Sequence, residues 1–278
     1  MTYTRLALPI DLHILTESAL DDGRLADYRD LQDRRLGPES GRFIAESEMV
    51  VRKLIASGLK IFSLLLTAPR LAALEAALAA CPDTVPVFLV PQAVMDKVAG
   101  FHVHRGCLAI AERPPAPEIP PDARTVVVLV DLVDVDNLGC IARNAAAFGA
   151  DAILLSPRSA DPFYRKAVRT SAGAVFALPI VRAASWPGDL LALRTRGFSL
   201  LAAVLADDAS PLASFAPPDR LAILFGTEGP GLDPATQRLC DQRVTIPMAK
   251  TPCVDSLNVA SASAVFLYHL TRAGVRPR

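Results

Sequence analysis

The sequence predicts an α/β protein in which a parallel sheet with helices on both faces follows a smaller α/β domain. Apolar runs of strand length alternate with helical patterns along the chain, which is typical of repeated βα units. One run, TVVVLVDLV at residues 125–133, is apolar almost throughout, as expected of a strand buried on both faces. Residues 112–124 hold five prolines in thirteen positions, and such density predicts a stiff, extended connector. We therefore expect domains at 1–111 and 125–278, joined by a linker at 112–124.

The elements of the first domain follow from their composition and ends. Apolar runs predict strands at 41–47, 59–67, 85–90 and 106–112. Two helices are expected between them, at 48–58, where Gly58 ends the pattern, and at 68–81, which is rich in alanine. The order of these elements predicts a small α/β domain of roughly a hundred residues.

The second part repeats the alternation over a longer stretch. After the strand at 125–133, strands are expected at 151–156, 174–180, 198–206, 221–226 and 243–247. The intervening helices are expected at 138–149, 162–173, 189–197 and 233–240, with a last one at about 256–272. Repeated βα units favour a parallel sheet. Ligands of such sheets bind beyond the carboxyl ends of the strands, so the informative residues should follow strands.

Composition excludes several classes of protein. No apolar run reaches the roughly 18 residues that span a membrane, and the N-terminus lacks the pattern of a signal peptide. Five dispersed cysteines without a CxxC pair argue against a disulfide framework and a zinc site. His102 and His104 have no third metal ligand nearby in the sequence. We expect a cytoplasmic protein without a metal.

Three segments that follow strands carry chemistry-bearing residues. In the first, residues 131–150, Asn137 and Gly139 precede Arg143, an odd residue in an otherwise apolar helix. Taken alone, Asn137 could simply cap that helix. In the second, LAILFGTEGPGLD at 221–233, three glycines surround Glu228. Glycines allow positive φ and close approach of a backbone to a ligand, although a plain tight turn would also use them.

The third segment spans residues 244–270. A strand ends at Ile246-Pro247-Met248, and Asp255 or Ser256 is expected to cap a helix that begins with small residues. A capped core helix would explain most of this pattern. It explains Asn258, early in the helix, least well.

Together and in this order, the three segments resemble motifs of the SpoU/TrmH branch of the SPOUT superfamily of RNA methyltransferases. The resemblance covers about residues 125–272. Its first motif, N-x-G-x-x-x-R, matches Asn137, Gly139 and Arg143, and its second matches Phe225 through Leu232. The third matches Ile246–Met248 and Ser256–Val259, and residues 168–180 resemble the segment between the first two motifs.

The resemblance implies a fold, a cofactor and a reaction. It implies a C-terminal trefoil knot, a homodimer with its active site at the subunit interface, and S-adenosyl-L-methionine as the cofactor. The expected reaction is 2′-O-methylation of a ribose in structured RNA. The implied catalytic residues are Arg143, Asn137, Glu228, Ser256 and Asn258. The implied cofactor-binding residues are Leu205, Gly226, Ile246, Met248 and Leu257.

The first domain resembles, more loosely, the RNA substrate-binding domain fused to many of these enzymes, which is built like a small ribosomal protein. Ser47 stands where the family usually has glycine, and Lys250 replaces a glycine of the third motif. Residues 1–111 hold 12 Lys+Arg against 13 Asp+Glu, a net charge of −1. Any RNA contact must therefore be local. The candidate residues are Arg29, Arg34, Arg35, Arg42 and Arg105.

Two other functions stay open at this point. A nucleotide-binding α/β oxidoreductase would share the fold class, but the chain lacks a GxGxxG fingerprint. A non-catalytic RNA-binding protein could keep the fold, although the intact polar residues of the three motifs count against it. The separate first domain favours a large structured RNA, with ribosomal RNA ahead of transfer RNA.

Overall fold

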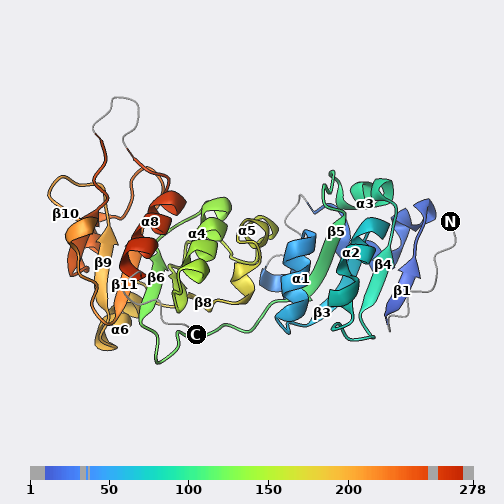
Figure 1. Cartoon of the computed structure of the whole chain (residues 1–278), viewed down its shortest axis with the longest axis horizontal. Coiled ribbons are helices and arrows are strands. Elements are labelled where there is room, and N and C mark those ends of the chain that lie inside the picture. Colours follow the sequence, from blue (N-terminus) through green and yellow to red (C-terminus); the bar gives the residue numbers. More distant parts are fainter. Residues whose placement is uncertain (1–9, 32–35, 37, 250–255, 272–278) are drawn as a thin grey trace. The chain divides into compact units, whose positions relative to one another are not determined.

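The computed structural model describes residues 10–31, 36, 38–249 and 256–271. Its contacts divide the chain into two compact units (Figure 1). Unit 1 comprises Met1–Pro114 together with Phe163–Phe176, and unit 2 comprises Pro115–Pro162 and Ala177–Arg278. No helix among the described residues is long and apolar enough to cross a membrane.

Unit 1 is built on a five-stranded mixed sheet in the order β1-β4-β3-β5-β2. The strands are β1 (Asp11–Ile14), β2 (Arg42–Glu46), β3 (Ile61–Leu66), β4 (Pro86–Leu89) and β5 (Cys107–Glu112). Strands β1, β4 and β3 run parallel, while β5 is antiparallel to both β3 and β2. Helices α1 (Glu48–Ala56), α2 (Ala68–Leu78) and α3 (Gln92–Ala99) complete it, and the sequence predicted all of these elements except β1 and α3.

Unit 2 contains a seven-stranded sheet in which every pair of neighbours is parallel, in the order β10-β12-β9-β11-β6-β7-β8. The strands are β6 (Thr125–Leu129), β7 (Ala152–Leu155), β8 (Ile180–Arg182), β9 (Ser199–Ala203), β10 (Ser210–Pro211), β11 (Leu221–Phe225) and β12 (Gln242–Thr245). The helices are α4 (Val135–Ala147), α6 (Gly188–Thr195), α7 (Pro234–Arg238) and α8 (Val259–Thr271). The predicted parallel α/β architecture is thereby confirmed.

Helices cover both faces of this sheet, as the continuous apolar run of β6 predicted. Val126 and Val128 pack into one core cluster with Leu190 and Leu193 of α6. Val127 and Leu129, which point to the opposite face, are also fully buried. Residues of strand β6 are therefore enclosed on both sides.

One predicted strand differs from the structure. The strand expected at 174–180 is a short 3-10 turn, Ala174–Phe176, and β8 begins only at Ile180. Ala172 and Gly173 adopt positive φ, which breaks an extended run, and Pro179 has no N–H for a strand ladder. The proline-rich segment is partly anchored, because Arg196 donates hydrogen bonds to the carbonyl oxygens of Ile119 and Pro120.

The segment Phe163–Phe176 includes α5 (Arg165–Thr170) and packs with unit 1, although it lies between β7 and β8 in the sequence. The carboxylate of Glu46, which is buried in β2, pairs with Arg165 and lies 3.5 Å from a guanidinium nitrogen of Arg169. The ring of Phe43 contacts those of both terminal phenylalanines of the segment. Unit 1 is therefore assembled from two separate stretches of chain.

Candidate active site

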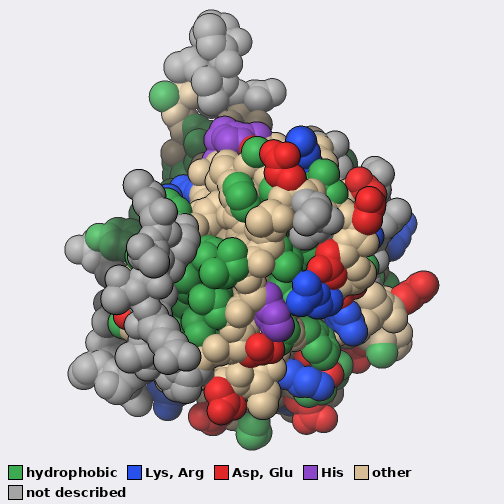
Figure 2. Space-filling model, turned by 90° about the vertical axis from the view of Figure 1, so that its right-hand side faces the viewer, with side chains coloured by type: hydrophobic (Ala, Val, Ile, Leu, Met, Phe, Trp, Pro, Cys, Tyr) green, Lys and Arg blue, Asp and Glu red, His purple; other side chains and the backbone are tan. Residues whose placement is uncertain are grey.

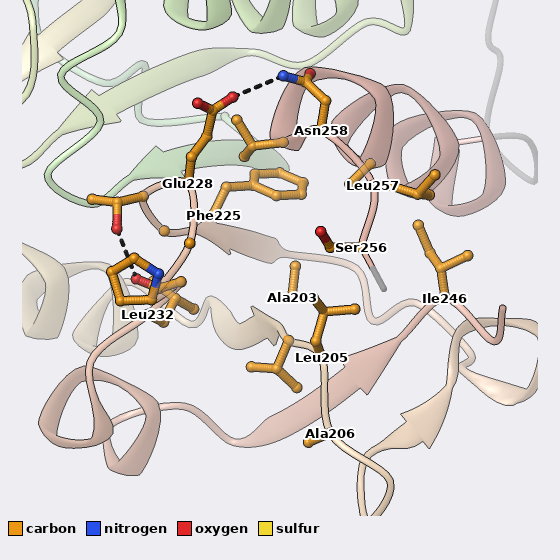
Figure 3. Close-up of a pocket in the computed structure, with 18 of the residues that line it drawn as sticks. Ala203, Leu205, Ala206, Phe225, Glu228, Leu232, Ile246, Ser256, Leu257 and Asn258 are labelled. Carbon is orange, nitrogen blue, oxygen red and sulfur yellow. Dashed lines mark hydrogen bonds between the residues drawn. The ribbon is translucent and has the colours of Figure 1, made fainter. Parts of the chain in front are cut away.

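A pocket of about 420 Å³ lies in unit 2 beyond the carboxyl ends of β9, β11 and β12 (Figure 3). Its walls come from residues 203–206, 225–232, 246, 248 and 256–259, with contributions from α8. This is the edge where a parallel α/β sheet is expected to bind ligands. Eight of the ten residues that the resemblance implies line it: Leu205, Gly226, Glu228, Ile246, Met248, Ser256, Leu257 and Asn258.

Asn137, Glu228 and Asn258 form a hydrogen-bonded cluster, which we call the amide–carboxylate cluster. The Asn258 side-chain amide donates to Oε1 of Glu228 at 2.8 Å and to Oδ1 of Asn137 at 2.9 Å. The Asn137 amide donates to the same Glu228 oxygen at 2.5 Å. Figure 3 shows Glu228 and Asn258 pointing toward one another from different loops. Asn137 and Asn258, which lie 91 and 30 positions from Glu228 in the sequence, thus donate to the same carboxylate oxygen.

Helix capping fixes the orientation of both asparagines. Asn258 accepts hydrogen bonds from the backbone N–H groups of Ala260 and Ser261 through Oδ1, so its NH₂ group must face Glu228. Helix α8 begins at Val259, directly after Asn258, so the predicted cap at Ser256 is wrong; Asp255, the other candidate, lies outside the described residues. The same correction holds for α4, because Asp134 caps it by accepting from the Asn137 N–H. The Asn137 side chain is consequently free for the cluster, and the residue is only 8% exposed.

The glycines of the second motif let the loop fold back on itself. A Cβ atom at Gly226 would lie 2.2 Å from the carbonyl carbon of Gly231 and 2.3 Å from the nitrogen of Leu232. Gly229 and Gly231 adopt φ of +81° and +69°, a region that favours glycine. The sequence analysis explained these glycines by close approach of the backbone to a ligand. The structure shows a further reason for glycine at position 226: the loop packs there against its own backbone.

Arg143 does not line the pocket. It is exposed on α4, six residues after Asn137 and so about 120° away around the helix axis. No hydrogen bond or ion pair joins it to another described residue. The neighbouring Asn144 instead faces α8, donating to the carbonyl oxygen of Ala260 and to Oγ of Ser263. Within one copy of the chain, Arg143 is therefore apart from the amide–carboxylate cluster.

Several lining residues were not predicted from the sequence. Two of them are polar: Gln237 donates to the carbonyl oxygen of Leu232, which also lines the pocket, and Arg243 pairs with Asp208 at 2.9 Å. The rings of Phe225 and Phe266 meet edge to face with centroids 5.7 Å apart. Ala203 ends β9, and Val204 and Ala206 follow it, so their position at the end of a strand was the available signal. Lys250, singled out above, lies outside the described residues.

Comparisons with known proteins agree with this geometry. Residues 124–268 match the model of the SpoU rRNA Methylase family. An uncharacterized tRNA/rRNA methyltransferase of Mycobacterium bovis is 43% identical over 264 residues, covering 91% of this chain and 90% of that protein. The crystal structure of an AdoMet-bound rRNA methyltransferase from Sinorhizobium meliloti is similar, with a TM-score of 0.79 and 28% identity over 96% of this chain and 100% of that one. That of an RNA 2′-O ribose methyltransferase has a TM-score of 0.76 and 26% identity, covering 94% and 98%.

Proposed function

Because the chain belongs to the SpoU rRNA methylase family, we propose that it transfers the methyl group of S-adenosylmethionine to a ribose 2′-hydroxyl of structured RNA. The observation that carries this proposal is the amide–carboxylate cluster at the pocket, built from all three sequence motifs. The similar structures include an rRNA methyltransferase and an RNA 2′-O ribose methyltransferase.

The pocket fits S-adenosylmethionine in size and chemistry. Small-molecule sites usually have volumes of about 300–1,000 Å³ and mostly apolar walls with few polar groups, and this pocket has about 420 Å³. Leu205 and Leu257 are exposed large apolar side chains at the pocket. A bound adenosine would cover such surface. The residues that would hold the cofactor are Leu205, Gly226, Ile246, Met248 and Leu257.

The residues of the site have distinct tasks in the proposed reaction. The cofactor supplies an electrophilic methyl group when bound. The protein must align the ribose oxygen for in-line attack and accept or stabilise its proton. Glu228, Ser256 and Asn258 would hold the ribose, the polar ends of the cofactor and Arg143. Asn137 and Asn258 keep the Glu228 carboxylate in one orientation, since both donate to the same oxygen.

Arg143 is proposed as an orienting and electrostatic group rather than a general base. Deprotonating an arginine side chain near neutral pH costs roughly 7 kcal/mol, so a neutral guanidinium is a poor base. A charged guanidinium can donate to a phosphate or to the ribose oxygen without that cost. Because Arg143 lies outside the pocket of its own chain, this task needs a second copy.

We therefore propose a homodimer that joins the α4 and α8 faces of two copies. Val265 and Tyr268 of α8 are 42% and 50% exposed, and Tyr268 contacts the ring of Phe148 next to α4. Exposed apolar residues on two packed helices favour a protein interface. In such a dimer, Arg143 of one copy could reach the pocket of the other.

The RNA is proposed to be ribosomal rather than transfer RNA, and the protein to act in the cytoplasm. Unit 1 supports a large structured target because it forms a second compact unit, which we propose binds part of the substrate RNA. The face of unit 1 that carries β1 and α3 shows Lys and Arg interspersed with Asp and Glu (Figure 2). Arg42 pairs with Asp27, and Arg29 donates to backbone carbonyls, whereas Arg105 is exposed. The arrangement supports local contacts rather than a uniformly basic surface.

The test is methyl transfer from labelled S-adenosylmethionine to unmodified ribosomal and transfer RNA, followed by digestion to nucleosides. We expect label in a 2′-O-methyl nucleoside from ribosomal RNA. Label in a base would contradict the ribose assignment, and label only in transfer RNA would contradict the target. RNA binding without transfer by a cofactor-loaded protein would favour the non-catalytic alternative.

A further inference from the structure

Two loops beside the proposed active site are joined to each other by hydrogen bonds. Residues 130–134 follow β6 and residues 156–162 follow β7, and β6 and β7 are neighbouring parallel strands. Their carboxyl ends lie at the same edge as that of β11, which pairs with β6 and leads into Glu228. The first loop also runs into α4, which carries Asn137. The loop pair therefore adjoins the amide–carboxylate cluster.

Side chains hold the two loops rigidly together. The Ser156 hydroxyl donates to Oδ1 of Asp131 at 2.8 Å and accepts from the Asp131 N–H at 2.7 Å. The Ala160 N–H donates to the Leu132 carbonyl oxygen at 2.8 Å. Arg182 of β8 donates to four carbonyl oxygens of the second loop, those of Ser156, Pro157, Ser159 and Ala160.

This network maintains an unfavourable backbone conformation. Asp131 has φ +53°, a left-handed conformation that costs a non-glycine residue about 1–2 kcal/mol. Such outliers persist only where the surroundings determine them, and they gather at functional sites. The strain at Asp131 places its carboxylate between the buried Ser156 and the exposed Arg158.

Arg158 extends into solvent from the second of these hydrogen-bonded loops. Its side chain is 81% exposed, and among the described residues its one hydrogen-bonding partner is the Asp131 carboxylate. Surface ion pairs of this kind contribute only about 0–1 kcal/mol to stability, so stability does not account for the arrangement. A guanidinium has five N–H donors, and Asp131 engages only part of them. The side chain is 81% exposed, so the remaining donors are open to solvent.

We propose that Arg158 binds a backbone phosphate of the RNA substrate close to the nucleotide that is methylated. The proposal rests on the proposed function for its choice of RNA. A planar guanidinium matches phosphate geometry through two parallel hydrogen bonds. Val133, 69% exposed in the first loop, offers an apolar surface for the adjacent sugar or base.

The experiment compares RNA binding by the full-length wild type, R158A, R158K and R194A. Arg194 is the matched control: it lies in the same unit, is 45% exposed and pairs with Asp241. Both residues of that pair precede strands, β9 and β12, so the pair lies at the opposite edge of the sheet. The probe is unmodified ribosomal RNA transcribed in vitro, titrated at several salt concentrations, with oligomeric state followed by light scattering.

We expect R158A to weaken RNA binding by about tenfold and to lower the slope of log K against log salt by about one. R158K should fall between R158A and wild type, because it keeps the charge but loses the fork. R194A should match wild type, and affinity for S-adenosylmethionine should be unchanged in all variants.

An affinity and salt slope of R158A equal to those of wild type would overturn the phosphate contact. So would an equal loss in R194A, or a loss that accompanies a change of oligomeric state. The proposed function fails separately: a wild type that binds RNA but does not methylate it contradicts that function, while the comparison of R158A with R194A still decides this site. A wild type that binds no RNA overturns both.

Discussion

Asn258 is predicted to have two separable tasks, capping α8 and holding Glu228. In N258A both are lost, whereas serine at this position keeps a capping oxygen but provides no amide donor. Loss of the cap should destabilise the protein by about 1 kcal/mol. Loss of the two donated hydrogen bonds affects a carboxylate oxygen and the buried Oδ1 of Asn137.

The expected size of the catalytic effect follows from these contacts. Hydrogen bonds to charged groups contribute about 1.5–3 kcal/mol, so one such bond lost in the transition state corresponds to roughly a 10- to 100-fold slower reaction. N258S should therefore lose methyl transfer as strongly as N258A, while retaining most of its free energy of unfolding. The assays are single-turnover methyl transfer and chemical denaturation. Near-normal transfer by N258S would refute the role of the cluster, and equal destabilisation of both variants would refute the division of tasks.

Three further predictions concern the loops and the pH dependence. G226A should lower S-adenosylmethionine affinity, measured by calorimetry, by about tenfold or more, because its Cβ would meet the backbone of Gly231. The control is G23A, since no atom lies within 4 Å of a Cβ built at Gly23. Unchanged affinity in G226A would mean that the cofactor binds elsewhere. R143A should reduce methyl transfer by at least about 100-fold with cofactor affinity within a few-fold, and near-normal turnover would remove Arg143 from the mechanism. Hydrogen bonds from Thr236 hold the pKa of Asp233 below its ordinary 3.8, so its contribution to stability is present above that value and is lost as the pH falls through the lower folded-state pKa. Urea unfolding at pH 2 to 5 should therefore show a shallower acid loss in D233N, and identical slopes would contradict this.

The sequence predicted the large elements because their apolar periodicity is long and clear. It missed β1, α3 and β10, which have four, eight and two residues. In α3, Pro91 precedes the helix and Gly100 ends it in a left-handed conformation, so the pattern is too short to stand out.

The residues of the candidate site were predicted better than the roles of their side chains. Local patterns suggested Asn137 and Ser256 or Asp255 as helix caps, whereas the caps are Asp134 and Asn258. Both asparagines donate to Glu228 through contacts across 91 and 30 residues of chain, and no local rule predicts contacts over such separations. The trefoil knot and the exact domain limits stay predictions for the same reason, since both are properties of the path of the whole chain.

The membership of Phe163–Phe176 in unit 1 bears on how such a protein can be rearranged by recombination. A gene fusion that exchanged only the sequence before the proline-rich segment would pair a new domain with an old α5. In the reverse exchange, moving the first domain without α5 would leave the buried Glu46 without Arg165 and Arg169, and leaving a buried charge unpaired costs about 3–5 kcal/mol. A workable chimera must transplant two stretches of sequence at once, so the boundary that matters for protein engineering is a surface in space rather than a position in the chain.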